Sequence, residues 1–176
     1  MGSTSSWDYI MRVSVSLALL ATASTGFALQ AQSPAAPDYR PLEFLVGHCW
    51  VGTFPDGKQT DEHCFEWVFD HKFIRDHHVV RNGASPYEGE TLYGWDPKEK
   101  RLAFWYWNSN GDILRGTVEY TAGSIVFPTQ YESKNGPVEL RAVWTPHGTN
   151  GYRAEQKQQV GSKWKSIMTM DFKRRR

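Results

Sequence analysis

Histidine and acidic side chains in the first half of the chain are the residues best suited to chemistry. His63 and His78 lie in segments that alternate polar and apolar residues, and Asp76 comes two positions before His78. Because histidine titrates near neutral pH, an inward histidine can carry protons or contact a ligand. Arg115, in a third such segment, is a candidate partner for an inward Asp76, since buried charge is costly unless it is paired. His78, Asp76 and Arg115 together would support acid–base catalysis or, alternatively, form a structural ion pair.

The two cysteines, Cys49 and Cys64, are placed to form a disulfide. They lie symmetrically on either side of the turn signal Pro55-Asp56-Gly57-Lys58. If Phe54 pairs with Gln59, the cysteines lie opposite each other at a close, non-hydrogen-bonded position. A three-residue loop with a bulge would shift this register by one residue and separate them. Such a bridge is typical of an oxidising compartment.

The pairs His48-Cys49 and His63-Cys64 also have the composition of a Cys₂His₂ metal site. Neighbouring residues of a strand point to opposite faces, so each histidine would face away from its own cysteine. We therefore expect no metal site, and we expect no cofactor. The same register places His63 on an aromatic, interior face, where the alternative to a ligand contact is a core histidine bonded to a backbone carbonyl.

Aromatic residues are the strongest indication of function. The chain has 8 Trp, 8 Tyr and 9 Phe, a density that suits a cavity for a planar or apolar ligand as well as simple core packing. Arg115 would favour a ligand with a carboxylate or another anion. The predicted ligand contacts come from several segments and are His63, Trp67, His78, Trp95, Trp105, Arg115 and Trp144.

From Cys49 onward the hydrophobic pattern has a period of two residues and is broken by short turn signals, which predicts β-strands. Every connection is too short for a parallel crossover, so the strands should form an antiparallel meander. Because an open meander exposes two edges, we expect an up-and-down barrel of about ten strands, with a two-sheet sandwich as the alternative. The expected strands are 48–54, 59–69, 73–82, 89–95, 101–107, 113–120, 124–131, 138–145, 151–159 and 163–173.

The residues before these strands have a different composition. Residues 1–31 contain an apolar run preceded by Arg12 and are expected to be a signal peptide, with Met11 as an alternative start. A membrane anchor is the alternative, but the run is short and no basic cluster follows it. Residues 32–40 would be a linker and 41–176 the barrel domain, and a short helix is expected over 38–47, where the two meet. We expect a periplasmic or secreted protein without a membrane span in the mature chain.

Two runs resemble a known group of proteins. Residues 45–52 (LVGHCWVG) are similar to the Gly…Trp opening of calycin (lipocalin-like) barrels. Residues 87–97 (YEGETLYGWDP), followed by Phe-Trp-Tyr-Trp at 104–107, resemble a bacterial domain family of unknown function with that barrel. This chain has one extra residue between Gly47 and Trp50, and Trp95 where the family usually has Tyr. The resemblance implies a barrel of about ten strands and no agreed activity.

The formal net charge of +1 gives no electrostatic reason to expect nucleic acid as a partner. Because aromatic residues on several strands support a chamber, we favour a secreted or periplasmic protein that binds a small hydrophobic or aromatic molecule, including an anionic one, in its barrel. The alternative is a small barrel enzyme, a lyase, isomerase or hydrolase, that uses a buried His/Asp/Arg set. A module that binds a partner protein or the cell envelope is a third and weaker alternative. The sequence does not predict an oligomeric state.

Overall fold

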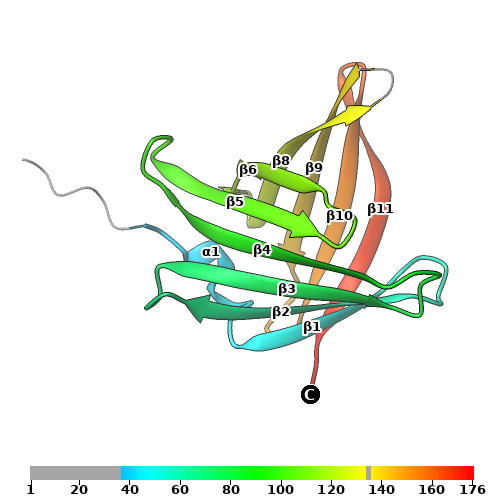
Figure 1. The fold of residues 1–176 in the computed structure, drawn as a ribbon, viewed down its shortest axis with the longest axis horizontal. Coiled ribbons are helices and arrows are strands. Elements are labelled where there is room, and N and C mark those ends of the chain that lie inside the picture. Colours follow the sequence, from blue (N-terminus) through cyan, green and yellow to red (C-terminus); the bar gives the residue numbers. More distant parts are fainter. Residues whose placement is uncertain (1–36, 134–135) are drawn as a thin grey trace, which may run out of the picture. The chain divides into compact units, whose positions relative to one another are not determined.

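The computed structural model describes residues 37–133 and 136–176, and nearly all of them lie in strands or tight turns (Figure 1). A single helical turn, α1 (Arg40–Glu43), precedes the strands. The predicted signal peptide, 1–31, and residues 32–36 of the predicted linker lie outside the described residues. No helix in the described part of the chain is long and apolar enough to cross a membrane. The strands are β1 (His48–Thr53), β2 (Thr60–Val68), β3 (Phe73–Arg81), β4 (Tyr87–Asp96), β5 (Arg101–Asn108), β6 (Ile113–Thr117), β7 (Glu119–Thr121), β8 (Ser124–Ser133), β9 (Gly136–Pro146), β10 (Gly151–Val160) and β11 (Lys163–Arg174).

All neighbouring strands are antiparallel, which confirms the predicted meander. The order of hydrogen-bonded strands is β6-β5-β4-β3-β2-β1-β11-β10-β9-β8-β7, so the first and last strands of the chain pair with each other. Eleven strands form where about ten were expected, because the segment 113–120 is divided into β6 and β7. The division falls at Val118, whose backbone N–H donates to the carbonyl of Leu102 at 2.9 Å.

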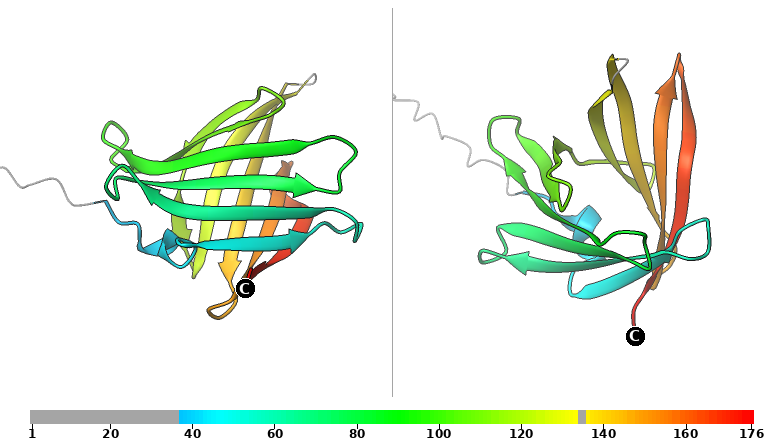
Figure 2. Two further views of the ribbon diagram at one scale, coloured as in Figure 1. Left: turned by 60° about the horizontal axis from the view of Figure 1, so that its bottom comes forward. Right: turned by 45° about the vertical axis from the view of Figure 1, so that its right-hand side comes forward.

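The sheet curls into a half-barrel (Figure 2), and the two ends of the strand order, β6 and β7, are not hydrogen-bonded to each other. β6 and β7 are the edge strands of this order, and β6 lies against β8. A closed barrel needs hydrogen bonds between its two edge strands. The break at Val118 leaves β6 on one edge and β7 on the other, so the fully closed barrel predicted from the sequence is not formed.

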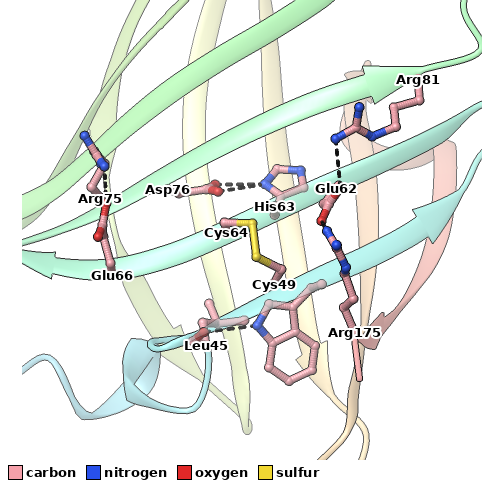
Figure 3. Close-up of a disulfide and its surroundings, with 11 residues drawn as sticks. Leu45, Cys49, Glu62, His63, Cys64, Glu66, Arg75, Asp76, Arg81 and Arg175 are labelled. Atoms are coloured by element: carbon pink, nitrogen blue, oxygen red, sulfur yellow. Dashed lines mark hydrogen bonds and ion pairs between the residues drawn. A yellow bond between two sulfur atoms is a disulfide. The ribbon is translucent and has the colours of Figure 1, made fainter.

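The interior of the curl is filled mainly by aromatic side chains. Trp50, Phe65 and Tyr152 are buried there with the aliphatic Ile74. The segment around α1 contributes the fully buried Leu42 and Leu45, and the indole N–H of Trp50 donates to the carbonyl of Leu45 at 3.0 Å (Figure 3). The helix expected over 38–47 is confined to one turn, which lies against this core.

The hairpin between β1 and β2 has the register that the turn symmetry predicts. Cys49 lies opposite Cys64 with a Cα–Cα distance of 4.0 Å, and the two form a disulfide (Figure 3). The backbone N–H of Phe54 donates to the carbonyl of Gln59 at 2.9 Å, as expected for a four-residue loop. This register turns His63 into the curl and keeps the disulfide on its outer side, so it decides which polar groups enter the interior.

Candidate functional site

A cavity of about 790 Å³ lies inside the curled sheet, and its lining includes residues 83–86 of the β3–β4 loop and Asn110 of the β5–β6 loop. One part of its wall is aromatic and aliphatic, and another part carries a compact set of histidine and aspartate side chains. The aromatic part is formed by Phe54, Tyr93, Phe104, Phe127 and Trp144. A largely apolar cavity with a few polar groups at one place is the usual form of a small-molecule site.

His63 lies between two aspartates on the polar wall. Its Nδ1 is 2.8 Å from Oδ2 of Asp76, and its Nε2 is 3.1 Å from Oδ2 of Asp61 (Figure 3 shows the contact with Asp76). The side chain of Asp76 is almost completely buried, and that of Asp61 is 10% exposed. Both ring nitrogens of His63 therefore have a carboxylate partner.

His78 extends this set toward the cavity mouth. Its Nδ1 is 3.0 Å from Oδ1 of Asp61, and its ring stacks on that of His63 with 4.6 Å between the centroids. Its Nε2 is 3.3 Å from the hydroxyl of Tyr106, which is 2.5 Å from the hydroxyl of Tyr87. One connected series of polar groups thus runs from the buried Asp61 to two tyrosine hydroxyls on the cavity wall.

Strand alternation and register explain why these groups meet. Asp61 and His63 are two residues apart on β2, so they share a face, and His63 lies directly opposite His78 on β3. Gly89 of β4 is the partner of His78 on the other side. A Cβ atom at Gly89 would lie 2.5 Å from Nε2 of His78 and 2.7 Å from the Tyr106 hydroxyl. Only a glycine leaves room there for the contact between His78 and Tyr106.

The carboxylates determine the charge of this wall. Burial lowers the pKa of His63, but the charge of Asp76 and the hydrogen bonds to Asp61 and Asp76 outweigh burial and raise the pKa to about 10. Burial raises the pKa of Asp61, but its hydrogen bonds to His63 and His78 outweigh burial and lower the pKa below its ordinary value. Burial and the Tyr87 hydroxyl raise the pKa of Tyr106. At neutral pH His63 is therefore an imidazolium between two carboxylates, and Tyr106 keeps its proton.

The structure brings together three of the seven predicted ligand contacts. His63, His78 and Trp144 line the cavity. Trp67 instead packs against Tyr39, with 5.1 Å between the ring centroids. Trp95 is half-buried and follows the alternation of Tyr93, but it is not part of the cavity wall.

Trp105 and Arg115 lie opposite each other on β5 and β6, away from the cavity. Arg115 forms an ion pair with Asp96 and lies over the ring of Trp105, and its side chain is 53% exposed. The expected pair between Asp76 and Arg115 is not formed, because Asp76 binds His63 instead. Phe104 and Tyr106 face the cavity from β5, so alternation turns Trp105 outward.

The sequence interpretation did not include Asp61, Tyr87 or Tyr106 among the site residues. Asp61 could have been found from its spacing, because it is two residues from the inward His63. Tyr106 lies in a strand with apolar residues on both faces, so the sequence pattern did not show which face is inside. Tyr87 precedes the clear alternation of β4, and its place follows only from the pairing with β3.

The chain was compared with models of protein families and with curated proteins. No family model and no curated protein matches it. The function must therefore be argued from the cavity itself.

Proposed function

We propose that this domain binds a small, largely apolar molecule, neutral or cationic, in the cavity of its curled sheet. The observation that carries the proposal is the cavity of about 790 Å³, with aromatic rings on one part of its wall and the His63–Asp61–His78 set on another. The rings would hold a planar or apolar body. The polar set would orient one hydrogen-bonding group of the ligand.

The charge of the wall limits the class of ligand. Asp61 and Asp76 are two carboxylates, and no lysine or arginine is among the described residues that line the cavity. Arg115, which the sequence interpretation assigned to an anionic group, lies outside it. An anionic ligand would bring a third negative charge to the polar wall, so we no longer favour an acid.

The resemblance to calycin barrels and the disulfide support the wider setting of this proposal. Binding of small apolar molecules inside a curled antiparallel sheet suits such a barrel. The Cys49–Cys64 bridge is of the kind that persists in oxidising compartments, in keeping with a periplasmic or secreted protein.

A matched pair of substitutions on one strand tests the proposal. Ala142 lines the cavity from β9, and its neighbour Val143 lies on the opposite face. In the full chain, Ala142→Phe should fill part of the cavity and weaken the binding of 1-naphthalenemethanol, followed by tryptophan fluorescence, at least tenfold. Val143→Phe should bind as the original protein does. Equal affinities of all three proteins, or no saturable binding to the original protein, would contradict the proposal.

A barrel enzyme is the second candidate, and one observation favours it. His78 and Tyr106 are hydrogen-bonded to each other and both border the cavity, as groups that exchange a proton with a bound molecule must. The arginine of the expected His/Asp/Arg set has no part in this version. If the site catalyses proton transfer, a ketone incubated with the original protein in D₂O should gain deuterium at the carbon next to its carbonyl group. The same ketone incubated with Tyr106→Phe should not.

A further inference from the structure

We propose that Asp61, His63 and His78 form a binding site for one divalent transition-metal ion of the zinc type. The three side chains come from the adjacent strands β2 and β3, and one donor atom from each lies within 4.8 Å of the others. The same three side chains form the polar wall of the proposed ligand cavity, but binding of a metal ion to them does not require an apolar ligand.

The donor atoms of both histidines lie next to the carboxylate of Asp61. Nε2 of His63 lies 3.1 Å from one oxygen of Asp61, and Nδ1 of His78 lies 3.0 Å from the other oxygen. Ligands about 2.1 Å from a zinc ion are about 3.0–3.4 Å from each other in octahedral or tetrahedral geometry. These two nitrogen–oxygen distances are close to those around a coordinated ion. Because the two rings are stacked with an interplanar angle of 14°, at least one ring would rotate to direct both nitrogens at the same ion.

The other nitrogen of each ring is already occupied by a hydrogen-bond partner. Nδ1 of His63 contacts the carboxylate of Asp76, and Nε2 of His78 contacts the hydroxyl of Tyr106. Because Nδ1–H of His63 donates to Asp76, its Nε2 is the ring nitrogen that faces Asp61. A metal ion bound there would take the place of the Nε2 proton, which would leave to solvent. Outer partners that fix each ring in this way are a regular feature of metal-binding histidines.

Two imidazoles and one carboxylate suit zinc, iron, nickel or copper better than calcium or magnesium. Three protein ligands also leave coordination positions free, and here these positions would face the cavity. The second group of acidic and sulfur side chains, Cys49, Glu62 and Cys64, does not compete, because its cysteines are joined in the disulfide and offer no thiolate.

Neighbouring histidines on β3 provide a matched test. The side chain of His78 is 9% exposed and faces Asp61, whereas that of His77 is 45% exposed and lies near Glu88. The full chain, without an affinity tag, is treated with EDTA and titrated with Zn²⁺ against a chromophoric chelator, and Co²⁺ absorption reports the ligands. We expect one tight site in the original protein and in His77→Gln. His78→Gln should lose it, and Asp76→Asn should weaken it about 10–100-fold, as for other outer partners.

If His78→Gln does not fold, two further measurements test the proposal. Tyr106→Phe removes the outer partner of His78 without touching a ligand and should weaken Zn²⁺ binding measurably. Zn²⁺ should also raise the melting temperature of the original protein in proportion to the logarithm of its concentration above Kd. Binding by the original protein that is no tighter than that of His78→Gln, or an equal loss in His77→Gln, would overturn the proposal and mean that protons alone hold the cluster.

Discussion

At the scale of single residues, Asp76 shows what the cluster requires of its members. It is 1% exposed, and its carboxylate contacts Nδ1 of His63 through both oxygens, at 3.1 and 2.8 Å. A carboxylate in this position is tolerated only because the positive charge of His63 lies beside it. Asp76 therefore holds His63 in the orientation that directs the other nitrogen toward Asp61.

Removing Asp76 should be costly even in metal-free protein. Asp76→Ala leaves His63 with Asp61 alone, and breaking a buried pair from one side costs about 3–5 kcal/mol, so we expect about 3 kcal/mol from urea unfolding in EDTA. Glu66→Ala removes an exposed pair with Arg75 from β2 and should cost less than about 1 kcal/mol. A loss for Asp76→Ala no larger than that for Glu66→Ala would show that the pair with His63 contributes little.

Asp96, the partner of Arg115, should make the stability of the fold depend on pH in the acidic range. Hydrogen bonds from the backbone N–H groups of Glu99 and Lys98 and from Arg115 hold the pKa of Asp96 below its ordinary value of 3.8, although burial opposes them. A lowered pKa stabilises the fold at pH values above 3.8, and this contribution is lost as the pH falls through the folded value. Asp96→Asn should therefore destabilise most at about pH 7, with a deficit that shrinks toward about pH 2. An equal deficit at both pH values in urea unfolding would contradict this expectation.

At the scale of the elements, the strands and the first hairpin could be predicted from the sequence. Which face of β5 and of β6 is turned inward could not. Turn residues mark the ends of the strands, and the loop between Phe54 and Gln59 fixes the register that joins Cys49 to Cys64. In β5 large apolar side chains lie on both faces, so hydrophobicity does not show which residues point inward. Trp105 was therefore assigned to the wrong side. Val118, where the segment 113–120 is divided, still pairs with Leu102 of β5, and no turn residue in the sequence marks this division.

Gly116 controls how closely the edge strand β6 approaches β8. A Cβ atom there would collide with the carbonyl of Pro128 on β8 and with the ring of Phe104. Gly116→Val should push β6 away from β8 and lower the free energy of unfolding by about 1–3 kcal/mol, as overpacking does. Thr117→Val, the next residue of β6 on its other face, should cost less in the same urea titration. If Gly116→Val lowers the free energy of unfolding no more than Thr117→Val does, the contact between β6 and β8 contributes little.

The disulfide stabilises the β1–β2 hairpin, which carries Asp61 and His63. It closes a loop with a sequence separation of 15 residues, for which the chain-entropy model gives about 3 kcal/mol. The double substitution Cys49→Ala and Cys64→Ala should lower the free energy of unfolding by about that amount. The original protein with its disulfide reduced should show a similar loss in the free energy of unfolding. An unchanged urea midpoint in both would show that the hairpin register is held by other contacts.

At the scale of the whole described domain, apolar enclosure and negative charge act on the same ligand. The aromatic part of the wall favours any planar body of suitable size, whereas Asp61 and Asp76 add two carboxylates beside the positive charge of His63. Because charges inside a protein interact more strongly than in water, the polar wall should discriminate between ligands of one shape and different charge. Discrimination by charge is thus a property of the assembled cavity and not of one side chain.

Three naphthalenes of similar size test this discrimination in EDTA-treated protein. 1-Naphthalenemethanol and 1-naphthalenemethylamine should quench tryptophan fluorescence saturably, and 1-naphthoate should bind at least tenfold more weakly than the alcohol. Asp61→Asn removes one carboxylate and should reduce the difference in affinity between naphthoate and the alcohol. Arg115→Met should leave all three affinities unchanged, because Arg115 is paired with Asp96 outside the cavity. Preferential binding of naphthoate, lost in Arg115→Met, would instead mean that the ligand lies on the outer face of β6.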